Sequence, residues 1–152
     1  MLSVHSLIPR ECVLIRPPVR DKKELLRLLV EAMDSCGRVR NADGLLKDTL
    51  AREALAPTGL GNRCAVPHAH SGEVENTVIA AALLEEGIDF GSPDGVPSRL
   101  ILFMAGPERH AGLHLKLLSR IARLFHDPEF VDRLLRSEDP EAFLELLRDR
   151  EE

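Results

Sequence analysis

Histidine is the residue type with the widest chemical range in this chain, and its spacing is uneven. Four of the six histidines form two close pairs, His68 with His70 and His110 with His114. An imidazole can move protons, bind a metal or carry a phosphoryl group near neutral pH. The other two histidines have no such neighbours, and we expect them to be solvated. The two pairs are therefore the first candidates for a functional site.

His68 lies in a setting that suits a reactive side chain. The short apolar run 64–66 predicts a strand, and Pro67, which cannot donate a hydrogen bond to a sheet, predicts the end or edge of that strand. The preceding loop contains Gly59 and Gly61, which allow a ligand to approach the backbone closely. A strand end beside a glycine loop can present a reactive nitrogen. The spacing alone leaves both a functional and a structural role open for His68.

His114 has the position of a core residue on an amphipathic helix. Leu118, Ile121 and Phe125 follow it at four, seven and eleven positions, so all four residues share one face. A buried core histidine would explain this pattern. His114 also lies at the start of the apolar face, where it could meet His68 at the edge of a sheet. Both interpretations stay open at this point.

Other catalytic chemistries find little support in the motifs. His110 and His114 have the i, i+4 spacing of helical zinc ligands, so a metal hydrolase using both histidine pairs has to be considered. The residue after His110 is Ala111, however, which leaves out the glutamate of HExxH, and Gly112 disfavours a helix there. Neither GxSxG nor GxxxxGK[ST] occurs in the sequence. We therefore expect no metal and no cofactor.

The composition is that of a globular protein in water. The 152 residues are 44% hydrophobic and 30% charged, with a formal net charge of −5. The lack of Trp and Tyr and the negative charge argue against binding single-stranded nucleic acid. Three cysteines without a CxxC pair predict reduced thiols in a cytoplasmic protein. No apolar run approaches the ~18 residues of a membrane span, so we expect no membrane insertion and no export.

Periodicity and capping residues predict the elements that must position the histidines. Besides the run before Pro67, continuous apolar runs predict strands at 12–15, 78–84 and 100–104. Helix-capping residues precede four amphipathic segments, at Asp21, Asn41, Asp127 and Asp139. A further helix is predicted over 113–125. The order predicts a single α/β domain over residues 1–152, in which helices flank a mixed sheet of four or five strands.

The stretch that leads to His68 resembles a family signature. The run Arg52–Ala69 contains an acidic residue, a loop of small residues ending in Thr-Gly-Leu-Gly, and a strand that closes on Ala-Val-Pro-His. It resembles the phosphorylation-site signature of phosphotransferase-system IIA components of the fructose/mannitol type, which include the nitrogen-regulatory IIA proteins. His114-Leu115, at the start of a Leu-rich helix, resembles the second active-site histidine of that family. The resemblance extends over nearly the whole chain.

Some positions depart from the family pattern. Cys64 replaces the usual aliphatic residue, and Pro57 replaces a typical Ser before the threonine of the loop. Ala69 and His70 stand where Gly and Lys are common in the regulatory branch. These departures leave the subtype open, and the resemblance assigns no role to His70.

The resemblance implies a phosphoryl carrier that needs no cofactor. His68 would accept a phosphoryl group from the phosphocarrier HPr or its nitrogen-branch relative and pass it to a IIB component. His114 would hydrogen-bond the phosphoryl group or orient His68, and Arg52 would offset its charge. The loop residues of the phosphoryl site would be Thr58, Gly59 and Gly61. The alternative is a regulatory module that binds other proteins according to its phosphorylation state, with no role in sugar transport.

This reading carries two structural expectations. The side chains of His68 and His114 should approach within about 4 Å, close to hydrogen-bond reach. Transient partners also need an exposed surface with an apolar centre. We expect that surface around Pro67–Ala69, with Leu60 and Leu113 as further members.

Overall fold

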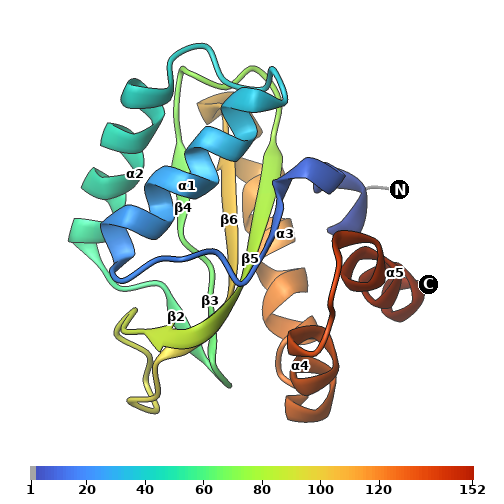
Figure 1. The fold of residues 1–152 in the computed structure, drawn as a ribbon. Helices are drawn as coiled ribbons and strands as arrows, with labels where there is room; N and C mark the ends of the chain where they lie inside the picture. Colours follow the sequence, from blue (N-terminus) through green and yellow to red (C-terminus); the bar gives the residue numbers. More distant parts are fainter. Residues whose placement is uncertain (1–2) are drawn as a thin grey trace.

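One mixed sheet organises the chain in the computed structural model, which describes residues 3–152 (Figure 1). Its strands are β1 (Val13–Ile15), β2 (Gly59–Gly61), β3 (Cys64–Ala65), β4 (His68–His70), β5 (Val78–Ile88) and β6 (Ser98–Gly106). They are arranged in the order β1-β5-β6-β3-β2, and β4 also pairs with β6. The β1–β5, β3–β6 and β4–β6 pairs are parallel, whereas β5–β6 and β2–β3 are antiparallel. The predicted α/β class with a mixed sheet is confirmed.

The sheet has six strands, so the expected four or five was too low. One reason is that a further strand, β4, follows the predicted strand before His68. β3 and β4 both pair with β6, and Val66 and Pro67 lie between them. Pro67 cannot donate, but its carbonyl accepts from the N–H of Met104 at 3.0 Å, which keeps the chain alongside β6. The other reason is that the glycine loop itself contributes β2.

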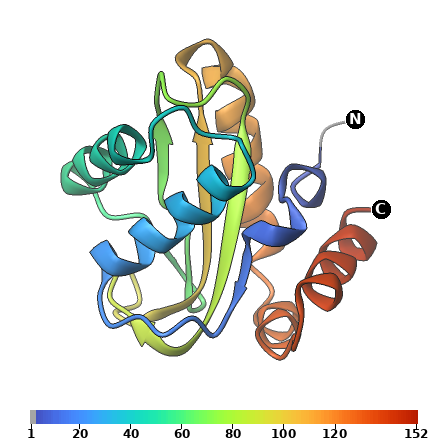
Figure 2. The same ribbon diagram turned by 45° about the horizontal axis from the view of Figure 1, so that its top comes forward.

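Helices cover both faces of this sheet (Figure 2). They are α1 (Lys22–Ser35), α2 (Ala42–Leu55), α3 (Ala111–Leu124), α4 (Pro128–Leu135) and α5 (Pro140–Glu151). Three short 3-10 helices, η1 (His5–Leu7), η2 (Arg10–Cys12) and η3 (Glu108–His110), complete the chain. The predicted capping residues are confirmed, because each accepts a hydrogen bond from the first helical turn: Asp21, Asn41, Asp127 and Asp139. The helix α3 begins two residues before the predicted start at 113.

Two hydrophobic clusters hold the helices on the sheet, and alternation along the strands separates them. In β5, Ile79 and Leu83 face one cluster, which contains buried residues of α3, α4 and α5. Ala80 and Leu84 face the other, which contains buried residues of α1 and α2. Successive strand residues point to opposite faces, so a strand buried on both faces reads as one continuous apolar run. The His68 side of β4 therefore belongs to the face that α3 covers.

A tight hairpin joins β2 to β3 and fixes the approach to His68. Asn62 and Arg63 at its turn have φ of 51° and 65°, and Gly61 has φ of 94°. The Asn62 side chain donates to the carbonyls of Phe125 and His126 at 3.1 and 3.0 Å. The hairpin is thereby tied to the end of α3, the helix that carries His114.

A buried carboxylate joins the two ends of the described chain. The Glu151 side chain, 1% exposed, accepts from the backbone N–H groups of Val4 and His5 at 2.8 and 2.9 Å. The His5 ring donates to it at 2.7 Å, and Arg120 Nε forms an ion pair with it at 3.0 Å. Figures 1 and 2 both show the N-terminal turn beside α5. We call this arrangement the Glu151 clasp.

The sequence analysis also made predictions about the state of the cysteines and about membrane-spanning segments. Cys12, Cys36 and Cys64 are free thiols in this structure, and the sulfur atoms of Cys12 and Cys36 are 3.6 Å apart. Within residues 3–152, no helix combines the length and the apolar character that crossing a membrane requires.

Candidate functional site

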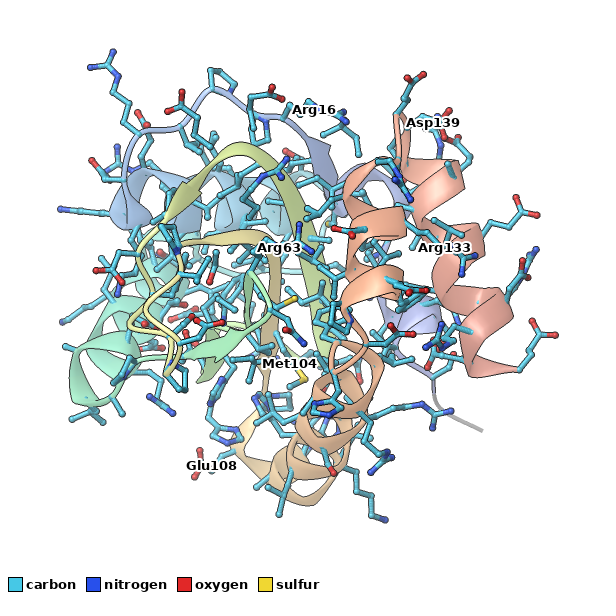
Figure 3. The ribbon with its side chains drawn as sticks, turned by 90° about the horizontal axis from the view of Figure 1, so that it is seen from below. Arg16, Arg63, Met104, Glu108, Arg133 and Asp139 are labelled. Carbon is cyan, nitrogen blue, oxygen red and sulfur yellow. The ribbon has the colours of Figure 1, made fainter. Side chains whose placement is uncertain are left out.

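His68 stands at the first position of β4, and its ring is fixed by one hydrogen bond. Its Cα is paired with that of Met104, a residue labelled in Figure 3. The side chain is partly exposed, and Nδ1 lies 2.8 Å from the carbonyl oxygen of Val66. A carbonyl only accepts, so Nδ1 carries the proton in this bond. In the neutral ring, Nε2 therefore holds the free lone pair.

The surroundings of His68 favour its neutral form. Burial lowers the pKa of His68 below its ordinary value, and the hydrogen bond to Val66 opposes that shift. The positive charge of Arg52 lowers the pKa further, whereas the carboxylate of Glu53 raises it. A neutral imidazole is the nucleophilic form of histidine, so the site keeps a nucleophile ready at neutral pH.

His114 is buried beside His68, on the face of α3 that covers the sheet. Its exposed fraction is 2%, and the ring centroids of His114 and His68 are 5.5 Å apart, at 60° to each other. Neither nitrogen of the His114 ring has a hydrogen-bond partner among the described residues. Burial, with added effects of His70 and His68, lowers the pKa of His114 to about 4. The two interpretations from the sequence combine, since His114 is both buried in the core and adjacent to His68.

The sequence analysis missed His70 as part of this group. The rings of His70 and His114 have centroids 4.3 Å apart, nearer than those of His68 and His114. Strand periodicity was the available signal, because side chains two positions apart in β4 share one face. His68 and His70 therefore both face α3, and Ala69 between them belongs to the cluster under α1 and α2.

The fourth histidine of the two pairs, His110, is held by a residue outside this group. It ends η3, and its Nδ1 forms a hydrogen bond of 3.1 Å with the hydroxyl of Thr77. Glu108, labelled in Figure 3, begins the same short turn. Across residues 3–152, no group of three His, Cys, Asp or Glu side chains has a geometry that would hold a metal ion.

Arg52 and Glu53, at the end of α2, supply the charges near His68. The Arg52 Nη1 donates to the carbonyl of Ala56 at 3.3 Å, which caps its own helix. Glu53 is 9% exposed and accepts from the Thr58 hydroxyl at 2.8 Å and from Lys22 Nζ at 3.2 Å. The Thr58 hydroxyl is therefore used to hold the glycine loop against α2.

Gly59 is required by the protein's own packing. A Cβ built at Gly59 would lie 2.8 Å from the Cα and N of Ser92, which is closer than such atoms approach in proteins. The Gly59 N–H also donates to the carbonyl of Phe90 at 3.1 Å. Ser92 thus fills the space on the Cβ side of Gly59. The loop thus positions β3, and through it His68.

The expected apolar surface is displaced from its predicted centre. Pro67 is buried and Ala69 is 1% exposed, so the expectation of a patch centred on them was wrong. Leu60 is 42% exposed, as expected, and Leu115, next to His114 in the chain, is 70% exposed. The apolar side chains that reach the surface near the histidines therefore come from β2 and α3.

Comparison with known proteins places this geometry in a family. Residues 6–150 match the family model described as "Phosphoenolpyruvate-dependent sugar phosphotransferase system, EIIA 2". A nitrogen regulatory protein of Bradyrhizobium diazoefficiens is 33% identical over 147 residues, which cover 96% of this chain and 95% of that protein. The fructose-specific EIIABC component of Bacillus subtilis is 27% identical over 146 residues, and the chain spans 23% of its length.

Solved structures agree with the sequence comparison. The nitrogen regulatory protein IIA-Ntr of Neisseria meningitidis superposes with a TM-score of 0.86 at 26% identity, covering 95% of this chain and 98% of that one. Enzyme IIAMTL of Escherichia coli, solved in complex with phosphorylated enzyme IIBMTL, superposes with a TM-score of 0.80 at 25% identity, covering 95% of this chain and 100% of that one. From its sequence match and its fold together, the chain belongs to the EIIA 2 family of the phosphoenolpyruvate-dependent sugar phosphotransferase system.

Proposed function

We propose that this chain is a phosphoryl carrier, in which Nε2 of His68 accepts a phosphoryl group and gives it to a second protein. The observation that carries the proposal is the hydrogen bond of 2.8 Å between His68 Nδ1 and the Val66 carbonyl. It holds the proton on Nδ1 and leaves the Nε2 lone pair available on a ring that is still partly exposed. Membership of the EIIA 2 family supports the same role.

The proposed step exchanges one phosphorus–nitrogen bond for another. The Nε2 lone pair attacks the phosphorus of a phosphohistidine on the donor protein, and the donor's P–N bond breaks. The bonding electrons return to the donor imidazole. His68 keeps its Nδ1 proton throughout, so the phosphorylated ring is cationic and the Val66 carbonyl stabilises it. Transfer to an acceptor runs the same step in reverse.

His114 and Arg52 have complementary roles in this proposal. The His114 nitrogens lack partners in the resting site, so its N–H is available to donate to a phosphoryl oxygen. Burial is the main cause of the lowered pKa of His68, and the positive charge of Arg52 lowers it further. The charge of Arg52 therefore acts on the reacting ring. A guanidinium has five N–H donors, and the bond to Ala56 uses one of them. Positioning and charge neutralisation are what phosphoryl transfer mainly requires.

The proposed partners are an HPr-like phosphocarrier as donor and a IIB component as acceptor. A solved relative forms a complex with phosphorylated enzyme IIBMTL, which supports the second partner by analogy. Leu60 on β2 and Leu115 on α3 offer exposed apolar surface for such partners. The matched relatives carry both sugar-specific and nitrogen-regulatory names, and a phosphoryl carrier on His68 is the function proposed for either setting.

The direct test is phosphorylation in a purified system. The chain is incubated with phosphoenolpyruvate, Enzyme I and HPr, and the intact mass is recorded. We expect the wild type to gain one phosphoryl group and His68→Ala to gain none. His114→Ala should still accept the group, but transfer should be slower by about a hundredfold, as for loss of one charge-stabilising donor. His126→Ala, at an exposed histidine, is the matched control and should behave as the wild type.

The position of the phosphoryl group gives a second, independent readout. Long-range proton–nitrogen NMR spectra distinguish the two phosphohistidine isomers, and we expect the Nε2 isomer at His68. His68→Gln, which keeps a polar side chain, guards against a folding defect in the alanine variant. Phosphorylation that persists in both His68 variants and is lost in His114→Ala would reverse the assignment. A phosphoryl group on Nδ1 would contradict the role of the Val66 bond.

A further inference from the structure

His70 is the exposed member of a three-histidine group. Its ring lies 4.3 Å from that of His114, which is 2% exposed, and the His68 ring lies 5.5 Å from His114 on the same side. His70 itself is exposed. The group therefore contains a half-buried ring, a fully buried ring and a ring in contact with water.

These three environments determine which ring can take up a proton. Burial, with the neighbouring rings, lowers the pKa of His114 to about 4, and burial also lowers the pKa of His68. Protonating either ring places a positive charge in a poorly solvated position. A proton on His70 stays in contact with water and avoids that penalty. His70 is therefore the ring of the group on which a positive charge would stay in contact with water.

We propose that His70 is a proton-dependent positioning residue of the phosphoryl site, whose imidazolium stabilises a phosphoryl group on His68. The inference rests on the proposed function, because it requires that group to be present. A phosphoryl group carries about −1.5 to −2 charges at neutral pH. The His70 ring lies on the same face of β4, two residues from the phosphorylated ring. A positive charge on the His70 ring should therefore favour the phosphorylated state, and acceptance should become more favourable as the pH falls.

The charged groups on α2 do not supply this pH dependence. Arg52 and Glu53 act on His68 with opposite signs. Asp48, also on α2, accepts from the Ser71 hydroxyl at 2.6 Å. Histidine is the only side-chain type whose ordinary titration range lies between about pH 5 and 8.

One other titratable group approaches the cluster from the α3 side. His110 precedes His114 by four residues and is held by Thr77 at 3.1 Å. It is the natural competitor for the proton, so its variant serves as a control. Among the described residues, the ring pairs of the group are His68–His114 and His70–His114, and the His110 ring belongs to neither pair.

The experiment measures the equilibrium of phosphoryl transfer between HPr and this chain at about pH 6 and about pH 8.5. Each variant is compared with the wild type against the same donor, so the donor's own pH dependence cancels. Relative to wild type, His70→Gln should lower the equilibrium constant about tenfold at the lower pH and little at the higher. His70→Lys, which keeps a positive charge, should match the wild type at the lower pH and exceed it at the higher.

Two controls make each outcome decisive. His110→Gln and His126→Gln should follow the wild-type pH profile. If His70→Gln also follows it while His68 is phosphorylated normally, the inference fails and the phosphoryl-carrier proposal stands. If His110→Gln removes the pH dependence, His110 and not His70 is the proton acceptor, which also overturns the inference. If the wild type accepts no phosphoryl group, it is the proposed function that fails.

Discussion

The carboxylate of Glu151 and the imidazole of His114 are equally inaccessible to water, yet their surroundings are opposite. Glu151 accepts three hydrogen bonds, from two backbone N–H groups and the His5 ring, and forms an ion pair with Arg120. His114 has no hydrogen-bond partner within residues 3–152. A buried polar group with its partners stabilises the fold, whereas one without them costs about 1–3 kcal/mol. The difference separates a polar group whose hydrogen-bonding capacity is used within the fold from one whose capacity is unused.

The largest expected effect is at the Glu151 clasp. Glu151→Leu removes the acceptor and leaves the N–H groups of Val4 and His5 buried without a partner. We expect the free energy of unfolding to fall by about 3 kcal/mol, measured by urea denaturation. Arg10→Ala breaks an exposed ion pair with Glu141 that joins the same ends of the chain, and it should leave the midpoint nearly unchanged. Equal losses of stability in Glu151→Leu and Arg10→Ala would contradict the distinction between a buried and an exposed contact.

The second effect is the loss of stability in mild acid, and it depends on His114. Its pKa is about 4 in the folded chain, against an ordinary value of 6.5. Between these values the unfolded chain binds a proton that the folded chain does not, so stability falls as the pH drops. The loss should reach about 3 kcal/mol by pH 4, and His114→Leu should remove most of it. A pH titration of the unfolding free energy measures both curves.

The Glu151 clasp should respond in a different pH window. Burial alone would raise the pKa of Glu151, but its hydrogen bonds, from the backbone of His5 and Val4 and from the His5 ring, hold the value below the ordinary 4.5. The stability that Glu151 contributes is thus present above that value and lost only as the pH falls through its lower folded pKa.

A stability curve of His114→Leu that still declines between about pH 6.5 and 4 with the wild-type slope would remove His114 as the cause.

The smallest expected effect has the opposite sign. His114→Leu replaces an unpartnered ring by an apolar side chain at neutral pH, and we expect a gain of about 1 kcal/mol in unfolding free energy. The same variant should slow phosphoryl transfer, because it removes the proposed donor. Thermal unfolding and the transfer assay, made on the same sample, measure both. A loss of stability together with intact transfer would show that His114 serves packing alone.

Local signals predicted much of the fold and long-range contacts were missed. Asp21, Asn41, Asp127 and Asp139 each act on the next few residues, so the sequence alone locates those helix starts. The strand β5 was predicted to end at Leu84 but continues to Ile88, because pairing with β6 extends it through exposed charged residues. The split of β3 from β4 likewise depends on pairing with β6.

In the candidate site, too, local signals were recognised from the sequence and long-range contacts were missed. His68 was found because its neighbours in sequence form a motif, and His114 because its helical face could be read. The proximity of His70 to His114 needed the strand register and the helix position together. Nothing near Glu151 in the sequence indicates its partners, which lie almost the whole chain length away.

The Glu151 clasp also has a topological meaning. It brings the backbone at Val4 and the last turn of α5 into hydrogen-bond contact, so the two ends of the described chain lie close together. A short flexible linker could join them. New ends could then be cut in the exposed turn at residues 93–95, which lies between β5 and β6 and outside both hydrophobic clusters. Such a circular permutant would have the same fold, with its helices and strands in a different order along the chain.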